Sequence, residues 1–181
     1  MKRILPLLLI LAPTAALAHP GHGIGFLGGL THPLTGTDHL LAMLAIGLWA
    51  ATLGGRAVWT LPVTFVAALV LGGTMGHLVG TDLPGVEQAI LTSLLVLGVV
   101  TAMAVRLPLG VAVVAVAGFG LVHGMAHGAE APSDFLPYAL GFVAASASLH
   151  AAGLMLGRLP WLGRSLGALT AMAGLALIVA G

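Results

Sequence analysis

Long apolar segments, interrupted only by short breaks, run through almost the whole of this 181-residue sequence. Hydrophobic residues make up 59% of the chain and charged residues only 6%, which excludes an ordinary soluble domain. A helix that crosses a lipid bilayer needs about 20 largely apolar residues. We therefore expect an all-α fold, a polytopic bundle of transmembrane helices.

The first 18 residues have the pattern of a secretory signal peptide. Lys2 and Arg3 precede an apolar core at residues 4–11, and residues 16–18 read Ala-Leu-Ala, a typical cleavage site. Cleavage would leave His19 at the mature N-terminus, outside the cytoplasmic membrane. The alternative interpretation is an uncleaved first span.

Six apolar segments of suitable length follow, and the connections between them are short and contain glycine or proline. No linker or second domain is apparent, so residues 19–181 are expected to form one membrane domain. We predict transmembrane helices at residues 33–53, 58–79, 86–105, 109–128, 135–156 and 161–179.

The distribution of charge predicts the orientation of these spans. With the mature N-terminus outside, the loops after spans one, three and five are cytoplasmic, and they hold every basic residue left after cleavage: Arg56, Arg106, Arg158 and Arg164. Basic residues favour the cytoplasmic side. The outer loops carry Asp82, Glu87, Glu130 and Asp134. This pattern is typical of a bacterial inner-membrane protein with both mature termini in the periplasm.

Glycines at every fourth position form two stripes, a pattern that lets helix backbones approach closely in a bilayer. The stripe in the second span consists of Gly72, Gly76 and Gly80, and the stripe in the fourth of Gly120, Gly124 and Gly128. We interpret them as packing surfaces that draw the nearby His77, His123 and His127 into the bundle rather than towards lipid.

Most of the eight histidines fall inside apolar segments, and two tight groups stand out: His-Pro-Leu-Thr-Gly-Thr-Asp-His at residues 32–39 and His-Gly-Met-Ala-His-Gly-Ala-Glu at residues 123–130. Ionisable side chains are costly in a membrane, so their clustering indicates function. Neutral imidazole and carboxylate bind divalent transition metals, and a chain without cysteine must build such a site from nitrogen and oxygen. The candidate ligands are His32, Asp38, His39, His123 and His127.

The predicted topology places the two groups at one depth. Pro33 suits the first turn of a helix, so Asp38 and His39 should lie about 8–10 Å below the outer end of span one. Span four runs the opposite way, which puts His123 roughly 8 Å deep. We therefore expect spans one and four to pack side by side, with Asp38 and His39 facing His123 and His127. Asp38 would either ligate metal or fix the tautomer of a neighbouring imidazole.

On one straight helix, His32 and His39 would share a face but lie about 10 Å apart along the axis, which suits two successive metal sites. In span four, His123 and His127 are four residues apart and Glu130 follows three later, so all three share one helical stripe. An i, i+4 histidine pair can chelate one ion.

Other polar residues are candidates for metal capture or relay. His19 and His22 lie in the histidine-rich mature N-terminus, where they would capture metal through their imidazoles and a free amine or would belong to a flexible tail. His77 would act as a ligand or a gate, or would simply pack, and Glu130 would capture ions or be a plain rim charge. His150, far into span five, is either a hydrogen-bonded packing residue or an inner relay.

The string His-Pro-x-x-Gly-x-Asp-His from His32 to His39 resembles the signature of the HupE/UreJ family of nickel/cobalt permeases. The segment from His123 to Glu130 is similar to the family's fourth-span motif, although Leu and Val precede His123 where an aromatic residue is expected. That departure concerns packing more than ligation. The resemblance covers the whole chain, and implies six spans and uptake of Ni²⁺ or Co²⁺ for metalloenzymes such as hydrogenase and urease or for cobalamin synthesis.

We therefore predict a permease whose partners are the lipid bilayer and a transported Ni²⁺ or Co²⁺ ion, with no prosthetic group. No Walker-type phosphate-binding motif occurs, which predicts secondary or passive transport. A net charge of +1 indicates no nucleic-acid partner. The sequence leaves the state of oligomerisation open.

Two other classes of function are compatible with paired histidines. An intramembrane metal-dependent hydrolase would use His123 and His127, but Gly124 stands where the His-Glu-x-x-His pattern has its general base. A bis-histidine haem protein would need a haem-sized gap between facing helices, which the glycine stripes disfavour.

Overall fold

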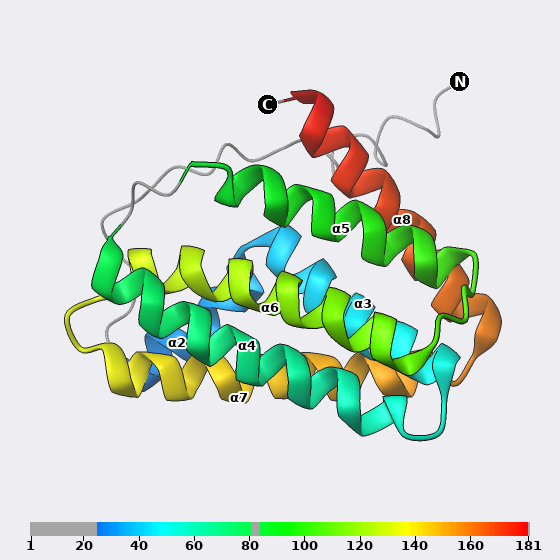
Figure 1. Ribbon diagram of the computed structural model, residues 1–181, viewed down its shortest axis with the longest axis horizontal. Helices are drawn as coiled ribbons and strands as arrows, with labels where there is room; N and C mark the ends of the chain where they lie inside the picture. The colour runs from blue at the N-terminus through cyan, green and yellow to red at the C-terminus, as the bar shows by residue number, and fades with distance from the viewer. Residues whose placement is uncertain (1–24, 81–83, 181) are drawn as a thin grey trace, which may run out of the picture.

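The computed structural model describes residues 25–80 and 84–180, and in these ranges the chain is all-helical (Figure 1). The prediction of an all-α fold is confirmed for this part of the chain. The helices are α2 (Gly25–Thr35), α3 (Thr37–Leu53), α4 (Ala57–Val79), α5 (Val86–Ala102), α6 (Leu109–Glu130), α7 (Phe135–Leu156) and α8 (Pro160–Ala180).

Four of the described helices, α4, α6, α7 and α8, are long and apolar enough to cross a membrane. The bent pair formed by α2 and α3 gives a fifth crossing if it counts as one broken span, and α5 is a shorter apolar helix. The structure thus supports a multi-pass membrane protein with four to five spans by length and composition. The predicted signal peptide, like His19 and His22, lies outside the described residues.

The first predicted span differs from the straight helix expected at residues 33–53. Helix α2 already begins at Gly25, Pro33 lies inside it rather than in a first turn, and the chain bends by 84° before α3. Gly36 causes the break, because its extended backbone (φ −89°, ψ 112°) interrupts the helix and its carbonyl then accepts the hydrogen bond from Leu40 N–H that starts α3. Pro33 weakens the preceding turn, since proline has no N–H to donate.

The two glycine stripes pack against each other, with α4 on α6. A methyl group on Gly124 would overlap the carbonyl oxygen of Leu69, and one on Gly128 would overlap that of Gly73. From the other side, Gly72 closely approaches the backbone of α6, whereas Gly80 faces open space. The glycine stripe of the fourth span thus packs against the second span, and the predicted side-by-side packing of spans one and four was wrong.

Helix α3 occupies the centre of the bundle, where it packs against α2, α4, α5, α7 and α8. Its middle section is fully buried, and Met43 and Ile46 are completely enclosed. The buried Trp49 donates its indole N–H to the carbonyl of Val105, 3.0 Å away. Together with Leu61 of α4, these side chains form a dry apolar core.

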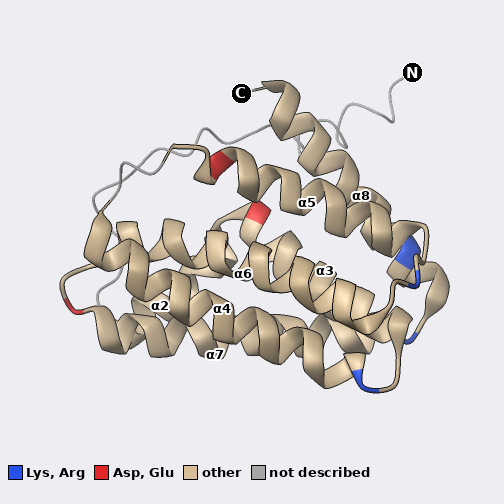
Figure 2. Cartoon of the chain, in the orientation of Figure 1, with Lys and Arg blue, Asp and Glu red and all other residues tan. Residues whose placement is uncertain are grey.

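Charged residues separate towards opposite ends of the bundle (Figure 2). The four arginines in the described residues lie in the α3–α4, α5–α6 and α7–α8 connections or in the first turns of α8: Arg56, Arg106, Arg158 and Arg164. The acidic residues lie away from this end (Figure 2).

Candidate metal site

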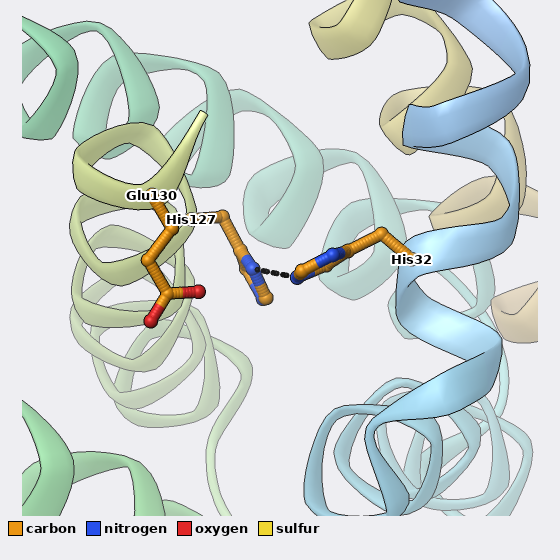
Figure 3. Close-up of side chains that lie close together, drawn as sticks. All are labelled: His32, His127 and Glu130. Atoms are coloured by element: carbon orange, nitrogen blue, oxygen red, sulfur yellow. Dashed lines mark hydrogen bonds between the residues drawn. The ribbon is translucent and has the colours of Figure 1, made fainter. Parts of the chain in front are cut away.

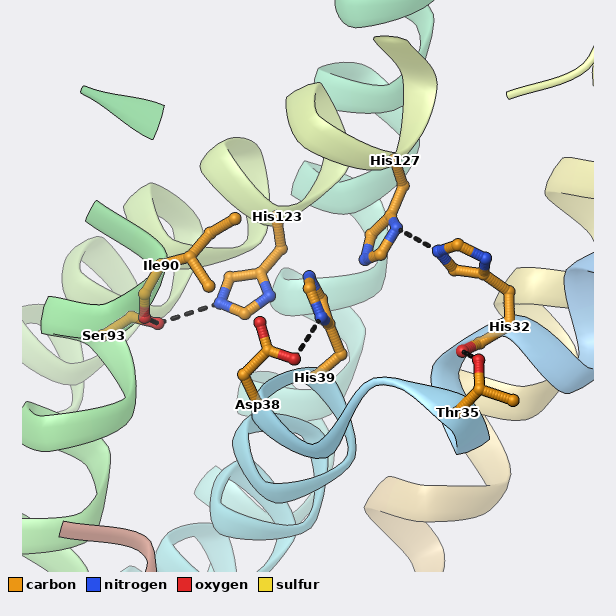
Figure 4. Close-up of polar contacts among 8 residues, drawn as sticks. All are labelled: His32, Thr35, Asp38, His39, Ile90, Ser93, His123 and His127. Carbon is orange, nitrogen blue, oxygen red and sulfur yellow. Dashed lines mark hydrogen bonds and ion pairs between the residues drawn. The ribbon is translucent and has the colours of Figure 1, made fainter. Parts of the chain in front are cut away.

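The five predicted ligands meet in the half of the bundle away from the arginines (Figure 4). His32 comes from the end of α2, Asp38 and His39 from the first turn of α3, and His123 and His127 from the last two turns of α6. The bend at Gly36 brings α2 and α3 to the site from different directions. The backbones of α3 and α6 are not packed side by side as predicted. The two helices meet through the imidazole rings of His39 and His123.

Three donors converge at the outer edge of this site, and we call His32, His127 and Glu130 the rim cluster (Figure 3). His32 Nε2 and His127 Nδ1 lie 3.0 Å apart and share a hydrogen bond. One donor atom from each of the three residues lies within 4.8 Å of the others, which makes this the single converging set of three such residues within the described ranges. His127 is buried, while Glu130 is exposed.

Asp38, His39 and His123 form a second group, which we call the inner cluster. His39 Nδ1 lies 2.9 Å from Asp38 Oδ1 and donates its proton to this carboxylate. Asp38 therefore fixes the tautomer of a neighbouring imidazole, one of its two predicted roles. His39 Nε2 and His123 Nδ1 are both buried without a hydrogen-bond partner in the structure. Orphaned buried nitrogens of this kind require an explanation, and a bound ion is one.

His39 joins the two clusters. Its ring centroid lies 4.1 Å from that of His127 and 5.1 Å from that of His123. His32 also contacts His127, with ring centroids 4.8 Å apart. The prediction that His32 and His39 would lie along one straight helix was wrong, because the bend at Gly36 places both rings against the same imidazole.

Aromatic side chains line the histidine site. Phe142 of α7 packs on His127 with ring centroids 4.3 Å apart, and Tyr138 lies 5.8 Å from His32. Phe65 of α4 lies 5.7 Å from His123. These walls keep the surroundings of the site apolar, which strengthens electrostatic interactions within it.

Two further histidine candidates in the described part of the chain, His77 and His150, belong to neither cluster. His77 stacks on Phe135 with ring centroids 4.4 Å apart and planes inclined by 13°. His150 is 1% exposed and meets the ring of Phe65 edge-on at 5.2 Å. Neither ring nitrogen of His150 has a hydrogen-bond partner in the structure, so of the predicted hydrogen-bonded packing role only the packing against Phe65 is seen.

Sequence reasoning missed Ser93 of α5, whose hydroxyl oxygen lies 2.8 Å from His123 Nε2. The signal for this contact in the sequence is the equal depth of the two residues. Ser93 is seven residues from the start of α5 at Val86, and His123 is seven residues from the end of α6 at Glu130. Both are roughly 10 Å from the same end of the bundle, at 1.5 Å per residue.

A multi-pass helical bundle that gathers imidazole and carboxylate donors in its interior defines a membrane protein of the metal-handling class. Similarity to known proteins agrees with this class and makes it more specific. The profile of the family described as HupE / UreJ protein matches residues 7–181. The chain is 43% identical over 176 residues to Protein HupE of Rhizobium leguminosarum bv. viciae, and the match covers 92% of each chain. No solved structure matches.

The chain belongs to the HupE/UreJ family. This membership supports in general a role in nickel or cobalt uptake, and it points to a transporter rather than an enzyme.

Proposed function

We propose that this protein carries Ni²⁺ or Co²⁺ across the bacterial inner membrane along a path lined by the rim and inner clusters. The observation that carries the proposal is the convergence of His32, His127 and Glu130. His39 connects them to a second, partly buried set of donors. Nitrogen and oxygen donors without thiolate suit nickel and cobalt.

The rim cluster is where an ion from the periplasm first meets the protein. Glu130 is exposed and attracts a cation, whereas His32 and His127 supply nitrogen ligands. Metal–imidazole bonds of about 2.1 Å at right angles place neighbouring nitrogens about 3.0 Å apart. The two imidazole nitrogens already have a separation of 3.0 Å, so a metal ion would replace the proton that they share, after a rotation of the rings.

The inner cluster takes the ion deeper by exchange of ligands. His39 contacts both His127 and His123, so it can hold an ion while one of these two imidazoles replaces the other. Ligands in a transport path should be few and exchangeable, because an ion that binds too tightly cannot leave.

Met43, Phe65 and Leu94 are completely buried in the apolar core, and Phe65 contacts both His123 and His150. We infer that these side chains close the way from the inner cluster towards the arginine end. A closed apolar layer favours a carrier that changes conformation over a permanently open pore. Release on the cytoplasmic side would then pass His150. Neither nitrogen of that ring has a polar partner among the described residues, so His150 would be an auxiliary relay on which most of the uptake does not depend.

The membrane potential is a sufficient driving force for this transport, which we propose to be secondary or passive. Moving one elementary charge across a membrane is worth about 2.3 kcal/mol per 100 mV. A divalent ion therefore gains about 4.6 kcal/mol when it enters down an inside-negative potential of about 100 mV. The arginines of the α3–α4, α5–α6 and α7–α8 connections support a cytoplasmic location for that end, with both mature termini in the periplasm.

Uptake by proteoliposomes that contain only this chain tests the proposal. Initial rates for Ni²⁺, Co²⁺, Zn²⁺ and Mn²⁺ should show entry of Ni²⁺ or Co²⁺ above that in empty liposomes, and an inside-negative potential should accelerate it. A His127→Ala variant serves as the inactive control, and Met103→Ala, at an exposed position outside the site, as the active one. Absence of Ni²⁺ and Co²⁺ uptake by the wild type would refute the proposal.

The hydrolase alternative gains no support from the site. His123 and His127 have different hydrogen-bond partners, Ser93 and His32, rather than one shared position. Gly124, at the position of the missing general base, packs against the backbone of α4.

A further inference from the structure

We propose that Ser93 is a positioning residue that holds His123 in one tautomer, with the proton on Nε2 and the lone pair on Nδ1. The ligand atom that His123 offers to a metal ion is then Nδ1. The metal part of this inference rests on the proposed function, whereas the assignment of the tautomer does not.

The hydroxyl of Ser93 carries a single proton. Its oxygen lies 2.7 Å from the carbonyl oxygen of Ile90, to which it donates, and 2.8 Å from Nε2 of His123. A hydroxyl donates only one proton and can accept on its lone pairs. If that proton pointed to His123, two oxygens would face each other at 2.7 Å with no proton between them. Both short contacts are satisfied only when His123 Nε2–H donates to Ser93.

A neutral imidazole carries one proton, so a proton on Nε2 leaves Nδ1 as the acceptor. His123 is fully buried, and its Nδ1 has no hydrogen-bond partner in the structure. Figure 4 shows this nitrogen on the side of the ring that faces Asp38 and His39. Ser93 therefore presents a lone pair to the interior of the cluster from the opposite side of the ring.

In the inner cluster, an oxygen acceptor fixes the tautomer of an imidazole in two places. Asp38 accepts the Nδ1 proton of His39, which leaves Nε2 of that ring as the unpartnered acceptor. Ser93 accepts the Nε2 proton of His123, which leaves Nδ1. Two imidazoles thus offer opposite ring atoms to one interior space, and a carboxylate of α3 and a hydroxyl of α5 determine which atoms these are.

Removal of the Ser93 hydroxyl should release this constraint. In Ser93→Ala, His123 Nε2–H would lose its acceptor, and the ring would populate the other tautomer, whose Nδ1 cannot ligate. Loss of a partner that orients a metal ligand typically lowers metal affinity or activity by about 10–100-fold. We expect the apparent KM for Ni²⁺ or Co²⁺ to rise by this factor, with a smaller change in the maximal rate.

The test combines nitrogen NMR of metal-free, ¹⁵N-histidine-labelled protein with uptake kinetics. The His123 signals, assigned by their loss in His123→Gln, should show protonated Nε2 and unprotonated Nδ1 in the wild type, and a mixture in Ser93→Ala. Ser146→Ala is the matched control, because Ser146 is also fully buried and donates to a carbonyl of its own helix but has no histidine partner. Ser93→Thr keeps the hydroxyl and should restore both readouts.

Protonated Nδ1 on His123 in the wild type would overturn the inference whatever the transport result. An unchanged KM and tautomer in Ser93→Ala would overturn it as well. If Ser93→Thr fails to insert into the membrane, two measurements still test the role of Ser93. These are the wild-type spectrum and the comparison of Ser93→Ala with Ser146→Ala. Failure of the wild type to take up metal would refute the proposed function, while the NMR result would still test the tautomer.

Discussion

His123 and His150 are both fully buried imidazoles that contact the ring of Phe65, yet their surroundings differ. His123 has a hydroxyl partner and lies beside the Asp38–His39 pair, so its unpartnered nitrogen faces further donors. Both nitrogens of His150 lack partners. A buried histidine becomes a credible metal ligand through its neighbours, and the same residue without them carries mainly a desolvation penalty.

The largest expected difference is in metal uptake, when His123 or His150 is replaced by alanine. His123→Ala removes a proposed ligand and should reduce Ni²⁺ or Co²⁺ uptake by more than ~100-fold, beyond the effect of losing an orienting partner. His150→Ala should leave most of the uptake, because no second donor accompanies that ring. Initial rates in proteoliposomes, corrected for the amount of inserted protein, measure both. Equal losses would mean that the two imidazoles contribute alike to the path.

Leucine substitutions at the same two positions should affect the stability of the fold differently. His150→Leu replaces an unpartnered buried polar group with an apolar one and should stabilise the fold, since an unsatisfied group costs about 1–3 kcal/mol. His123→Leu leaves the hydroxyl of Ser93 without its second partner and should bring no comparable gain. Thermal melting in detergent provides the measurement. A lower melting temperature for His150→Leu would indicate that His150 has a polar partner in the membrane.

The packing that supports the site can be tested on two glycines of α6. Gly124→Ala would push a methyl group into the backbone of α4 and should destabilise the protein by about 1–3 kcal/mol, the usual effect of overpacking. Gly118→Ala is the control, because nothing lies within 4 Å of a methyl group there. Melting temperatures of the two variants should therefore separate. If Gly118→Ala were as harmful, general helix effects would account for the loss.

We expect the smallest effect from Gly36→Ala, at the break between α2 and α3. An alanine Cβ at Gly36 would lie 3.1 Å from His39 Nδ1 and 3.2 Å from Asp38 Oδ1, so these side chains must shift by a few tenths of an ångström. The backbone angles of Gly36 are accessible to alanine, and the fold should persist. We expect a raised KM for metal with an unchanged melting temperature. An unchanged KM would show that the Asp38–His39 pair tolerates displacement.

Much of the fold was predictable because proline and glycine mark the helix ends. The segment predicted at residues 135–156 matches α7, and α4 begins only one residue before the predicted 58. The first span was predicted incorrectly, because Pro33 was interpreted as the first turn of one straight helix. In the structure Pro33 lies near the end of α2, and a new helix begins after Gly36. Six spans and a cleaved signal peptide stay predictions.

The sequence predicted which residues meet in the candidate site better than it predicted how they contact one another. Matching depths placed His39 near His123 and His127, and the structure agrees. The contact between His32 and His127 depends on the bend at Gly36, a tertiary feature that local spacing does not contain. Ser93 escaped notice because a serine in an apolar helix ordinarily bonds to its own backbone, as this one also does.

The central claim is that a transported ion binds between these histidines, and the position of a bound metal tests it most directly. Anomalous diffraction from crystals of the protein soaked with Co²⁺, collected on both sides of the cobalt edge, would locate the ion. We predict a peak among His32, His127 and Glu130, or beside His39 and His123, and its loss in the His127→Ala or His123→Ala variant, respectively. A cobalt peak elsewhere with both clusters empty would contradict the account.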